Sequence, residues 1–324
     1  MSNFCQSVAT QSLREHTKNL RSFLCTMGLP IAGKEIELEK GKYYKLIASD
    51  AKGLDFDLNG VWQHRDLILL LVKREFVSRY KQTILGPAWA VIQPLLTTFV
   101  FTFIFGNVAG LASCGAVPTF LFYMCGNIAW QFFSGCLNGT ANTFVANKAI
   151  MGKVYFPRLC MPISTAISQL ISFGIQAVMF IVFLIAYLFV PGYKIAINAY
   201  ALMAPVLVLQ MAILGMGCGI IISSLTTKYR DLQFLVSFGV SLWMYGTPVA
   251  YSMDLFQGSR VLHLIARVNP MSSVIEMMRY GFLGGEAGSL DWLSYGWSWL
   301  FTLIVLIVGV LTFNKVERTF MDTV

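Results

Sequence analysis

A stripe of amide and hydroxyl side chains interrupts one apolar stretch of the chain at helical spacing. Its members, which fall on one face of a helix, are Asn127, Gln131, Ser134 and Asn138. A later apolar stretch carries a similar stripe, made of Thr165, Ser168, Gln169, Ser172 and Gln176. An unsatisfied amide in lipid is costly, so each stripe must face another helix or water.

The chemistry that these stripes predict is neutral hydrogen bonding, and two interpretations are open. The amides hold helices together, which is a common use of Gln and Asn in membrane bundles. Alternatively, they line a channel in which amides and aromatic rings contact sugar hydroxyls and ring faces. In that case the side chains along the glycan path are Tyr123, Asn127, Trp130, Gln131, Gln169 and Gln176.

Basic residues are concentrated before the first apolar stretch. Segment 59–82 predicts an amphipathic helix, with one face formed by Leu69, Val72, Phe76 and Tyr80 and another by Arg74, Ser78 and Lys81. The segment is too charged to span a membrane but suits the inner membrane surface. It is either a generic anchor or a basic surface that meets an anionic lipid-linked substrate or a partner.

The sequence contains no recognisable catalytic or metal-binding set. His16, His64 and His263 are too scattered to join the seven cysteines as metal ligands. Segment 28–35 matches G-x-x-x-x-G-K, but Glu35 stands where a Ser or Thr hydroxyl must meet magnesium. We therefore expect no catalytic residue, metal or cofactor in this chain.

The elements that must position the polar stripes are membrane spans. Apolar residues make up 56% of the chain and charged residues only 12%, against about 25% charged in soluble domains. No charged residue occurs between Lys81 and Lys148. Such a chain could not keep a soluble surface hydrated, which excludes a soluble enzyme, a disordered chain and a coiled coil. Basic residues also sit in the short loops between apolar spans, where they fix orientation, and this placement argues against a nucleic-acid partner.

The pattern predicts an all-α polytopic membrane protein with six transmembrane helices, since about 20 apolar residues cross the hydrocarbon layer. The predicted spans are 84–106, 117–138, 162–190, 200–225, 232–252 and 293–314. With both termini cytoplasmic, the inner segments hold 20 of the 24 basic residues, as the positive-inside rule requires. In the fourth span, Gly215, Gly219 and Ser223 form a small-residue face that favours close helix packing.

The segment 253–292, on the outer side, is rich in apolar residues and predicts short helices on or in the outer leaflet. Asn269-Pro270 is typical of a helix start and Gly284-Gly285 of a stop. Glu276 and Arg279 are three residues apart and could pair, most simply as a surface ion pair. Near the other end of the chain, Ile36 and Leu38 alternate with glutamates, a pattern that favours a short strand.

Ionisable residues within spans usually mark proton or ion coupling, and these spans are essentially free of them. The sequence therefore favours a passive path that is powered from outside the chain. Segment 147–158, between the second and third spans, could receive force from a cytoplasmic ATPase. An integral membrane enzyme that acts on lipid-linked sugars is a rival hypothesis.

Several motifs together resemble the permeases of ABC-2 type polysaccharide exporters, the membrane subunits that export O-antigen, teichoic acid or capsular polysaccharide. The motifs lie at 65–75, 79–87, 89–94, 153–157, 229–231 and 269–279, and the resemblance covers about 62–318. It implies a homodimer with two copies of a separate nucleotide-binding subunit, which binds ATP and Mg. It also implies an interfacial helix before the first span, a coupling helix, and outer gate helices before the last span.

The resemblance implies export of an undecaprenyl-linked polysaccharide across the bacterial inner (cytoplasmic) membrane. By the same reasoning, the lipid pyrophosphate would meet Lys73, Arg74, Arg79 and Lys81, and the ATPase would contact Lys148, Lys153, Tyr155 and Arg158. Glu276 and Arg279 would belong to the outer gate. Residues 83–318 would form the transmembrane domain, and residues 1–58 a soluble cytoplasmic extension of open role. An ABC-2 exporter of drugs or lipids is an alternative.

Overall fold

The computed structural model describes residues 36–38, 42–44, 58–81, 83–110, 115–151, 157, 159–226, 231–253 and 260–323. The chain divides into two units, Met1–Asp55 and Phe56–Val324. In the first unit the described residues form an antiparallel hairpin of β1 (Ile36–Leu38) and β2 (Lys42–Tyr44), with Ile36 opposite Tyr44. The strand indicated by the alternation around Ile36 and Leu38 is thus confirmed.

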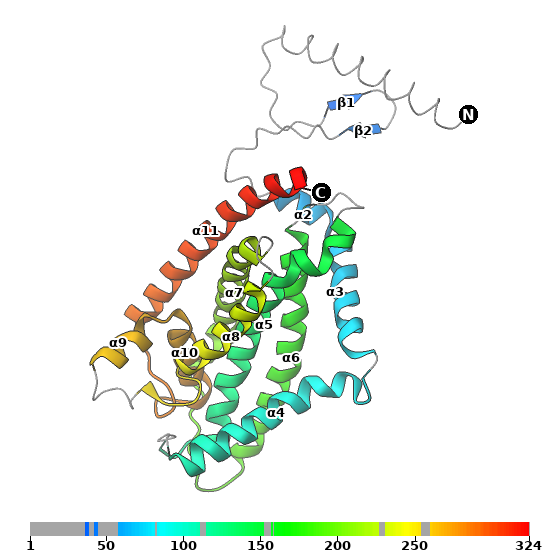
Figure 1. Ribbon diagram of the computed structural model, residues 1–324. Helices are drawn as coiled ribbons and strands as arrows, with labels where there is room; N and C mark the ends of the chain where they lie inside the picture. The colour runs from blue at the N-terminus through cyan, green and yellow to red at the C-terminus, as the bar shows by residue number, and fades with distance from the viewer. Residues whose placement is uncertain are drawn as a thin grey trace. The chain divides into compact units, whose positions relative to one another are not determined.

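All the regular elements among the described residues of the second unit are helices (Figure 1). Its first half contains α2 (Leu58–Gln63), α3 (Arg65–Tyr80), η1 (Gly86–Ala88), α4 (Trp89–Phe101), the π-helical η2 (Thr102–Val108), α5 (Thr119–Met151) and α6 (Cys160–Leu188). Its second half contains η3 (Ala199–Met203), α7 (Ala204–Thr226), α8 (Leu232–Tyr245), α9 (Arg260–Val268), α10 (Pro270–Leu283) and α11 (Trp292–Thr323).

Four helical stretches among the described residues are long and apolar enough to cross a membrane: Gly86–Val108, Cys160–Leu188, Ala199–Thr226 and Trp292–Thr312. Each coincides with a predicted span. Two further predicted segments coincide with α5, which carries the first amide stripe, and with the shorter apolar helix α8. The chain is therefore a polytopic helical membrane protein.

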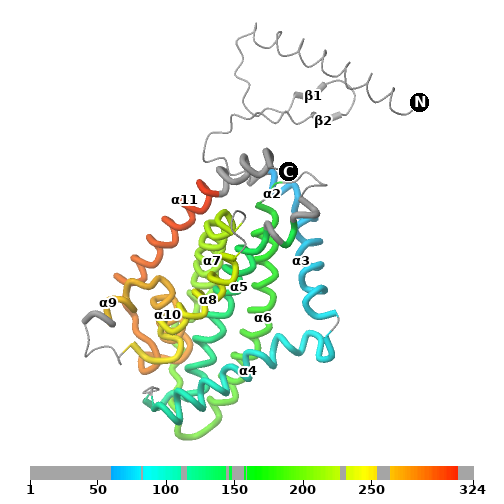
Figure 2. The backbone as a smooth tube through the Cα atoms, viewed as in Figure 1, coloured from blue at the N-terminus to red at the C-terminus, as the bar shows by residue number. Residues whose placement is uncertain are grey.

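The bundle is organised around α5, which packs against both α6 and α7. In Figure 2 the chain reverses direction between α5, α6, α7 and α8, and α11 returns alongside α7. Gly215 and Gly219 allow α7 to approach α5, because a Cβ at Gly215 would lie 2.8 Å from Cys136 Cβ and one at Gly219 would lie 2.5 Å from Thr140 Cβ. The predicted small-residue packing face is confirmed.

The structure corrects the predicted apolar face of segment 59–82. The side chains that α3 buries are those of Ile68, Leu71, Val72 and Tyr80, whereas Leu69 is 62% exposed. Of these, Ile68, Leu71 and Val72 pack with Cys160 and Met161 at the start of α6. Residues 67–72 are all apolar, so their periodicity could not decide which side of α3 would meet a neighbouring helix.

Both predicted helix boundaries in the outer segment are confirmed at α10. The side chain of Asn269 accepts a hydrogen bond from the backbone N of Met271 at 3.1 Å, and Pro270 occupies the first turn. Gly284 ends the helix with φ of +101°, a backbone conformation that suits glycine. Figure 1 places α9 and α10 at the end of the bundle where α8 ends and α11 begins.

Candidate functional site

A polar cleft of about 560 Å³ opens between α4, α5 and α6, with Met244 of α8 at one side. The two amide stripes meet in it, because the polar face of α5 is turned toward the polar face of α6. The amide and hydroxyl side chains of α4, α5 and α6 that line the cleft are Gln93, Thr97, Asn127, Gln131, Ser134, Asn138, Gln169, Ser172 and Gln176.

A chain of hydrogen bonds connects the three helices across this cleft. Asn127 Nδ2 donates to Thr98 Oγ1 of α4 at 3.4 Å, and Gln131 Nε2 donates to Asn127 Oδ1 at 3.3 Å. Gln176 Nε2 of α6 then donates to Gln131 Oε1 at 3.4 Å. The amides therefore bond between helices and also line a cleft, so the two interpretations of the stripes describe the same residues.

The three hydrogen bonds donated by these side-chain amides are long compared with the usual N–H···O separation of about 2.9–3.0 Å. A long hydrogen bond holds its partners weakly. Gln131 and Gln169 are also only partly buried. Asn127 and Gln176, in contrast, are buried.

Trp130 adds an aromatic wall to the cleft, and Tyr123 does not. Trp130 lines the cleft and packs edge-on against Trp243 of α8, with ring centroids 6.2 Å apart. Tyr123 is fully buried and packs edge-on against Phe101 of α4 and Phe122. Five of the six side chains expected along the glycan path line the cleft, and Tyr123 lies in the core.

The contribution of α4 to the cleft was not among the predicted site residues. Trp89, Gln93 and Thr97 of α4 line the wall opposite the two stripes. The sequence feature that could have indicated this contribution is Gln93, a glutamine within an apolar span. Only the tertiary structure reveals that Gln93 faces the same cavity as Gln131.

The four predicted basic residues of the interfacial helix are all exposed, but they do not form one cluster. Arg79 lines the cleft and pairs with Glu75 at 3.3 Å. Arg74 donates to Asn147 Oδ1 near the end of α5 at 2.5 Å. Lys73 and Lys81 are exposed and do not belong to the cleft lining. Burial raises the pKa of Glu75, and the positive charges of Arg79 and Arg74 oppose this shift.

The segment expected to contact the ATPase is described only at its margins. α5 extends to Met151 and α6 begins at Cys160. Lys148 belongs to α5, and its side chain lies outside the described residues, as do Lys153, Tyr155 and Arg158. The G-x-x-x-x-G-K match at 28–35 also lies outside them.

Glu276 and Arg279 form a buried ion pair, so the surface ion pair expected from the sequence is wrong. Their charged groups are 3.6 Å apart, and the two side chains are 6% and 0% exposed. Arg279 also donates to the carbonyl oxygens of Pro248 at 2.6 Å and Val249 at 2.8 Å. The reason is that α10 is enclosed by other helices, including α5 and α11, instead of lying on an open surface.

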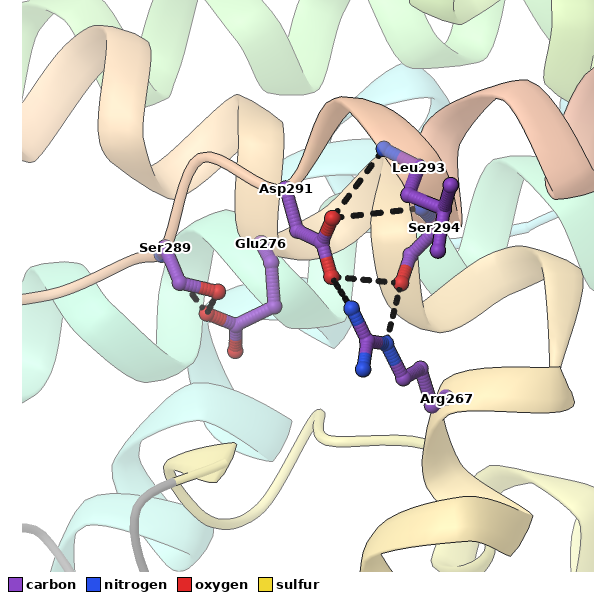
Figure 3. Close-up of polar contacts among 6 residues, drawn as sticks. All are labelled: Arg267, Glu276, Ser289, Asp291, Leu293 and Ser294. Carbon is purple, nitrogen blue, oxygen red and sulfur yellow. Dashed lines mark hydrogen bonds and ion pairs between the residues drawn. The ribbon is translucent and has the colours of Figure 1, made fainter.

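A second pocket, of about 330 Å³, lies between α9, α10 and the start of α11. Figure 3 shows that Arg267 of α9 donates to both Asp291 and Ser294. Asp291 also caps α11, accepting from the backbone N of Leu293 at 3.0 Å. Partial burial would raise the pKa of Asp291, but the hydrogen bonds from Ser294 and the Arg267 guanidinium outweigh burial and lower it.

Comparison with known proteins gives consistent matches over this helical unit. A family model described as ABC-2 type transporter matches residues 66–283. Two Klebsiella pneumoniae proteins named O-antigen export system permease protein RfbA are each 29% identical, over 258 and 259 residues, covering 79% of this chain and 94% of each relative. A Myxococcus xanthus protein of the same name is 29% identical over 216 residues, covering 66% of this chain and 79% of the relative.

Proposed function

This chain belongs to the ABC-2 type transporter family, and from that membership we propose that it is the membrane permease of an ATP-driven polysaccharide exporter. It is a transport permease and not an enzyme. Its relatives are named for O-antigen export. We propose further that its cargo is an undecaprenyl-linked polysaccharide, exported across the bacterial inner membrane.

The observation that carries the cargo assignment is the amide-lined cleft. Each amide offers both a hydrogen-bond donor and an acceptor without a charge, which suits a moving chain of neutral hydroxyl groups. Trp130 supplies an aromatic surface beside Asn127 and Gln131. Because the hydrogen bonds that these amides donate are long, successive sugar residues can replace them without a deep energy well that would stop movement.

The proposed assembly is a homodimer of this chain with two copies of a nucleotide-binding subunit that holds ATP and Mg. Segment 147–158, with Lys148, Lys153, Tyr155 and Arg158, would dock that subunit. The proposed subunit has six spans, with α5 and α8 added to the four apolar helices. The bias of basic residues toward the inner segments supports cytoplasmic termini.

Among the basic residues of α3, Arg79 is the best placed to meet the lipid pyrophosphate. It is the member of the set Lys73, Arg74, Arg79 and Lys81 that lines the cleft. A cation at headgroup depth gains about 1 kcal/mol near an anionic surface. At the other end of the bundle, Glu276 and Arg279 would hold α10 as part of an outer gate.

A second candidate, an exporter of drugs or lipids, is favoured by an apolar groove of about 610 Å³. It lies along α6 and α7, and Leu170, Ile181 and Val208 are among its lining residues. This groove would accept an acyl chain or the undecaprenyl chain of the first candidate's cargo, but no glycan. The two candidates therefore differ in whether the cargo also requires the amide-lined cleft.

The test is export by the complete transporter in cells, with amides of the cleft made apolar. Asn127→Leu combined with Gln131→Leu should abolish surface glycan while the permease still copurifies with its ATPase subunit. Gln233→Leu, which removes an amide of α8 outside the cleft lining, is the matched control and should export normally. Unchanged glycan export in the cleft variant would remove the cleft from the glycan path, and unchanged glycan export after deletion of this permease would overturn the proposal and favour the lipid alternative.

A further inference from the structure

We propose that the pocket between α9, α10 and α11 is a binding subsite for one neutral sugar residue of the exported glycan. The inference rests on the proposed function, because it assigns the cargo of the cleft to a second place in the same subunit. The pocket is separate from the cleft, since the two share no lining residue.

Two residues that line this pocket carry buried hydroxyl groups that make no hydrogen bond within the described part of the chain. Ser272 of α10 is 1% exposed and Tyr295 of α11 is 7% exposed. Both line the pocket, and neither Ser272 Oγ nor Tyr295 Oη has a hydrogen-bond partner within the described part of the chain. Buried hydroxyls are almost always satisfied in folded proteins, so a pair left open at one cavity indicates a polar occupant.

Five of the other polar residues of the pocket are already held in place by hydrogen bonds. Arg267 Nε donates to Ser294 Oγ at 2.8 Å, and Ser294 Oγ donates to Asp291 Oδ2 at 2.8 Å. Across the pocket, Glu276 Oε2 accepts from the backbone N of Ser289 at 3.0 Å and from its hydroxyl. Figure 3 shows these two groups of contacts side by side. A ligand would therefore meet fixed donors and acceptors and would have to order few side chains on binding.

The charge balance of the pocket favours a neutral ligand. Each carboxylate faces an arginine, Asp291 beside Arg267 and Glu276 beside Arg279. The carboxylates would repel a phosphate, and Arg267 would repel a metal cation. A volume of about 330 Å³ is at the small end of ligand pockets. A monosaccharide unit, which is neutral and both donates and accepts hydrogen bonds, fits all three properties.

Photo-crosslinking in the intact transporter tests this assignment. The photoreactive residue p-benzoylphenylalanine is placed at Ser273, which lines the pocket, in cells that make their own lipid-linked glycan. The control position is Leu264, which is 61% exposed on α9 outside the pocket lining. After irradiation, periodate and a biotin hydrazide label any glycan bonded to the permease. We expect a labelled ladder at Ser273 and none at Leu264.

The hydroxyl groups of Ser272 and Tyr295 are then removed in the variant that carries the photoreactive residue at position 273. Ser272→Ala with Tyr295→Phe should reduce the crosslinked glycan about tenfold, the loss expected for two hydrogen bonds. The same double substitution should leave the melting temperature of the purified complex unchanged or higher, because it deletes unsatisfied buried groups. A purely structural role predicts a lower melting temperature instead. Tyr193→Phe, which removes a hydroxyl outside the pocket lining, should change neither result.

A third crosslinking position separates this inference from the proposed function. The same photoreactive residue at Ser134 reports on the cleft. Labelled glycan at Ser134 but not at Ser273 would overturn the subsite and leave polysaccharide export standing, with water as the occupant of the pocket. Absence of labelled glycan at both positions would overturn both proposals. Equal labelling at Leu264 and Ser273 would also overturn the subsite.

Discussion

The guanidinium of Arg279 in α10 lies over the ring of Phe122 in α5, with its central carbon 3.6 Å from the ring centroid. The same guanidinium donates to the carbonyls of Pro248 and Val249, which follow the end of α8. One side chain therefore joins α10 to α5 and to the turn after α8. A flat cation that donates in several directions is needed for this, and only arginine provides it.

Truncating Arg279 should be strongly destabilising. Arg279→Ala leaves the buried Glu276 carboxylate without its cation, a change that typically costs about 3–5 kcal/mol. Thermal unfolding of the purified complex measures the effect, and Lys194→Ala, at an exposed position, is the control. Combining Arg279→Met with Glu276→Gln should recover part of the loss. A double variant less stable than Arg279→Ala would contradict this account of the pair.

Adding a methyl group at Gly219 should disrupt the packing of α7 on α5. A Cβ there would lie 2.5 Å from Thr140 Cβ and 2.8 Å from the Leu137 carbonyl oxygen, and overpacking of this kind costs about 1–3 kcal/mol. Gly239→Ala on α8 is the matched control, because a Cβ at that position meets no atom within 4 Å. Melting temperatures of the two variants check the prediction, which fails if both behave like the unaltered protein.

Acid should selectively weaken the contacts of Asp291. Its folded-state pKa is lowered, so the carboxylate stabilises the fold above the unfolded value of about 3.9. That stability is lost as the pH falls through the lower folded-state pKa. The difference in melting temperature between the unaltered protein and Asp291→Asn should be constant near neutral pH. It should shrink once the pH falls below the pKa of Asp291 in the unfolded chain. A difference that grows in acid would reverse the assigned direction.

Reversing the charge at Arg79 should impair export without preventing assembly. Arg79→Glu places a carboxylate at the cleft, next to Glu75, where it would repel an anionic lipid pyrophosphate. Arg65→Glu changes the same charge on the same helix, at a side chain that is 64% exposed and outside the cleft lining. Surface glycan, normalised to the amount of assembled complex, should fall for Arg79→Glu alone. Equal export by the two variants would contradict the proposed contact between Arg79 and the lipid pyrophosphate.

Local patterns in the sequence determined where this chain is helical in the membrane and which faces are polar. The charge-free stretches located the four apolar spans, and Asn269-Pro270 and Gly284 bounded α10, because span length, capping and glycine conformation depend on nearby residues. The spacing of Asn127 and Gln131 likewise placed both on one face. Such features depend on residues within one helix, so they can be predicted from the sequence without knowledge of the tertiary structure.

Contacts between distant segments were decided only by the tertiary structure. Periodicity could not place Tyr123 in the core while its neighbours on the same face line the cleft, because Phe101 of α4 covers it. Periodicity also could not show that Leu69 is exposed, because it lies within an all-apolar run. Nor could it reveal that other helices enclose α10, which makes the ion pair of Glu276 and Arg279 a buried pair instead of the expected surface pair. Burial depends on which helix packs opposite, and helices far apart in sequence supply that partner.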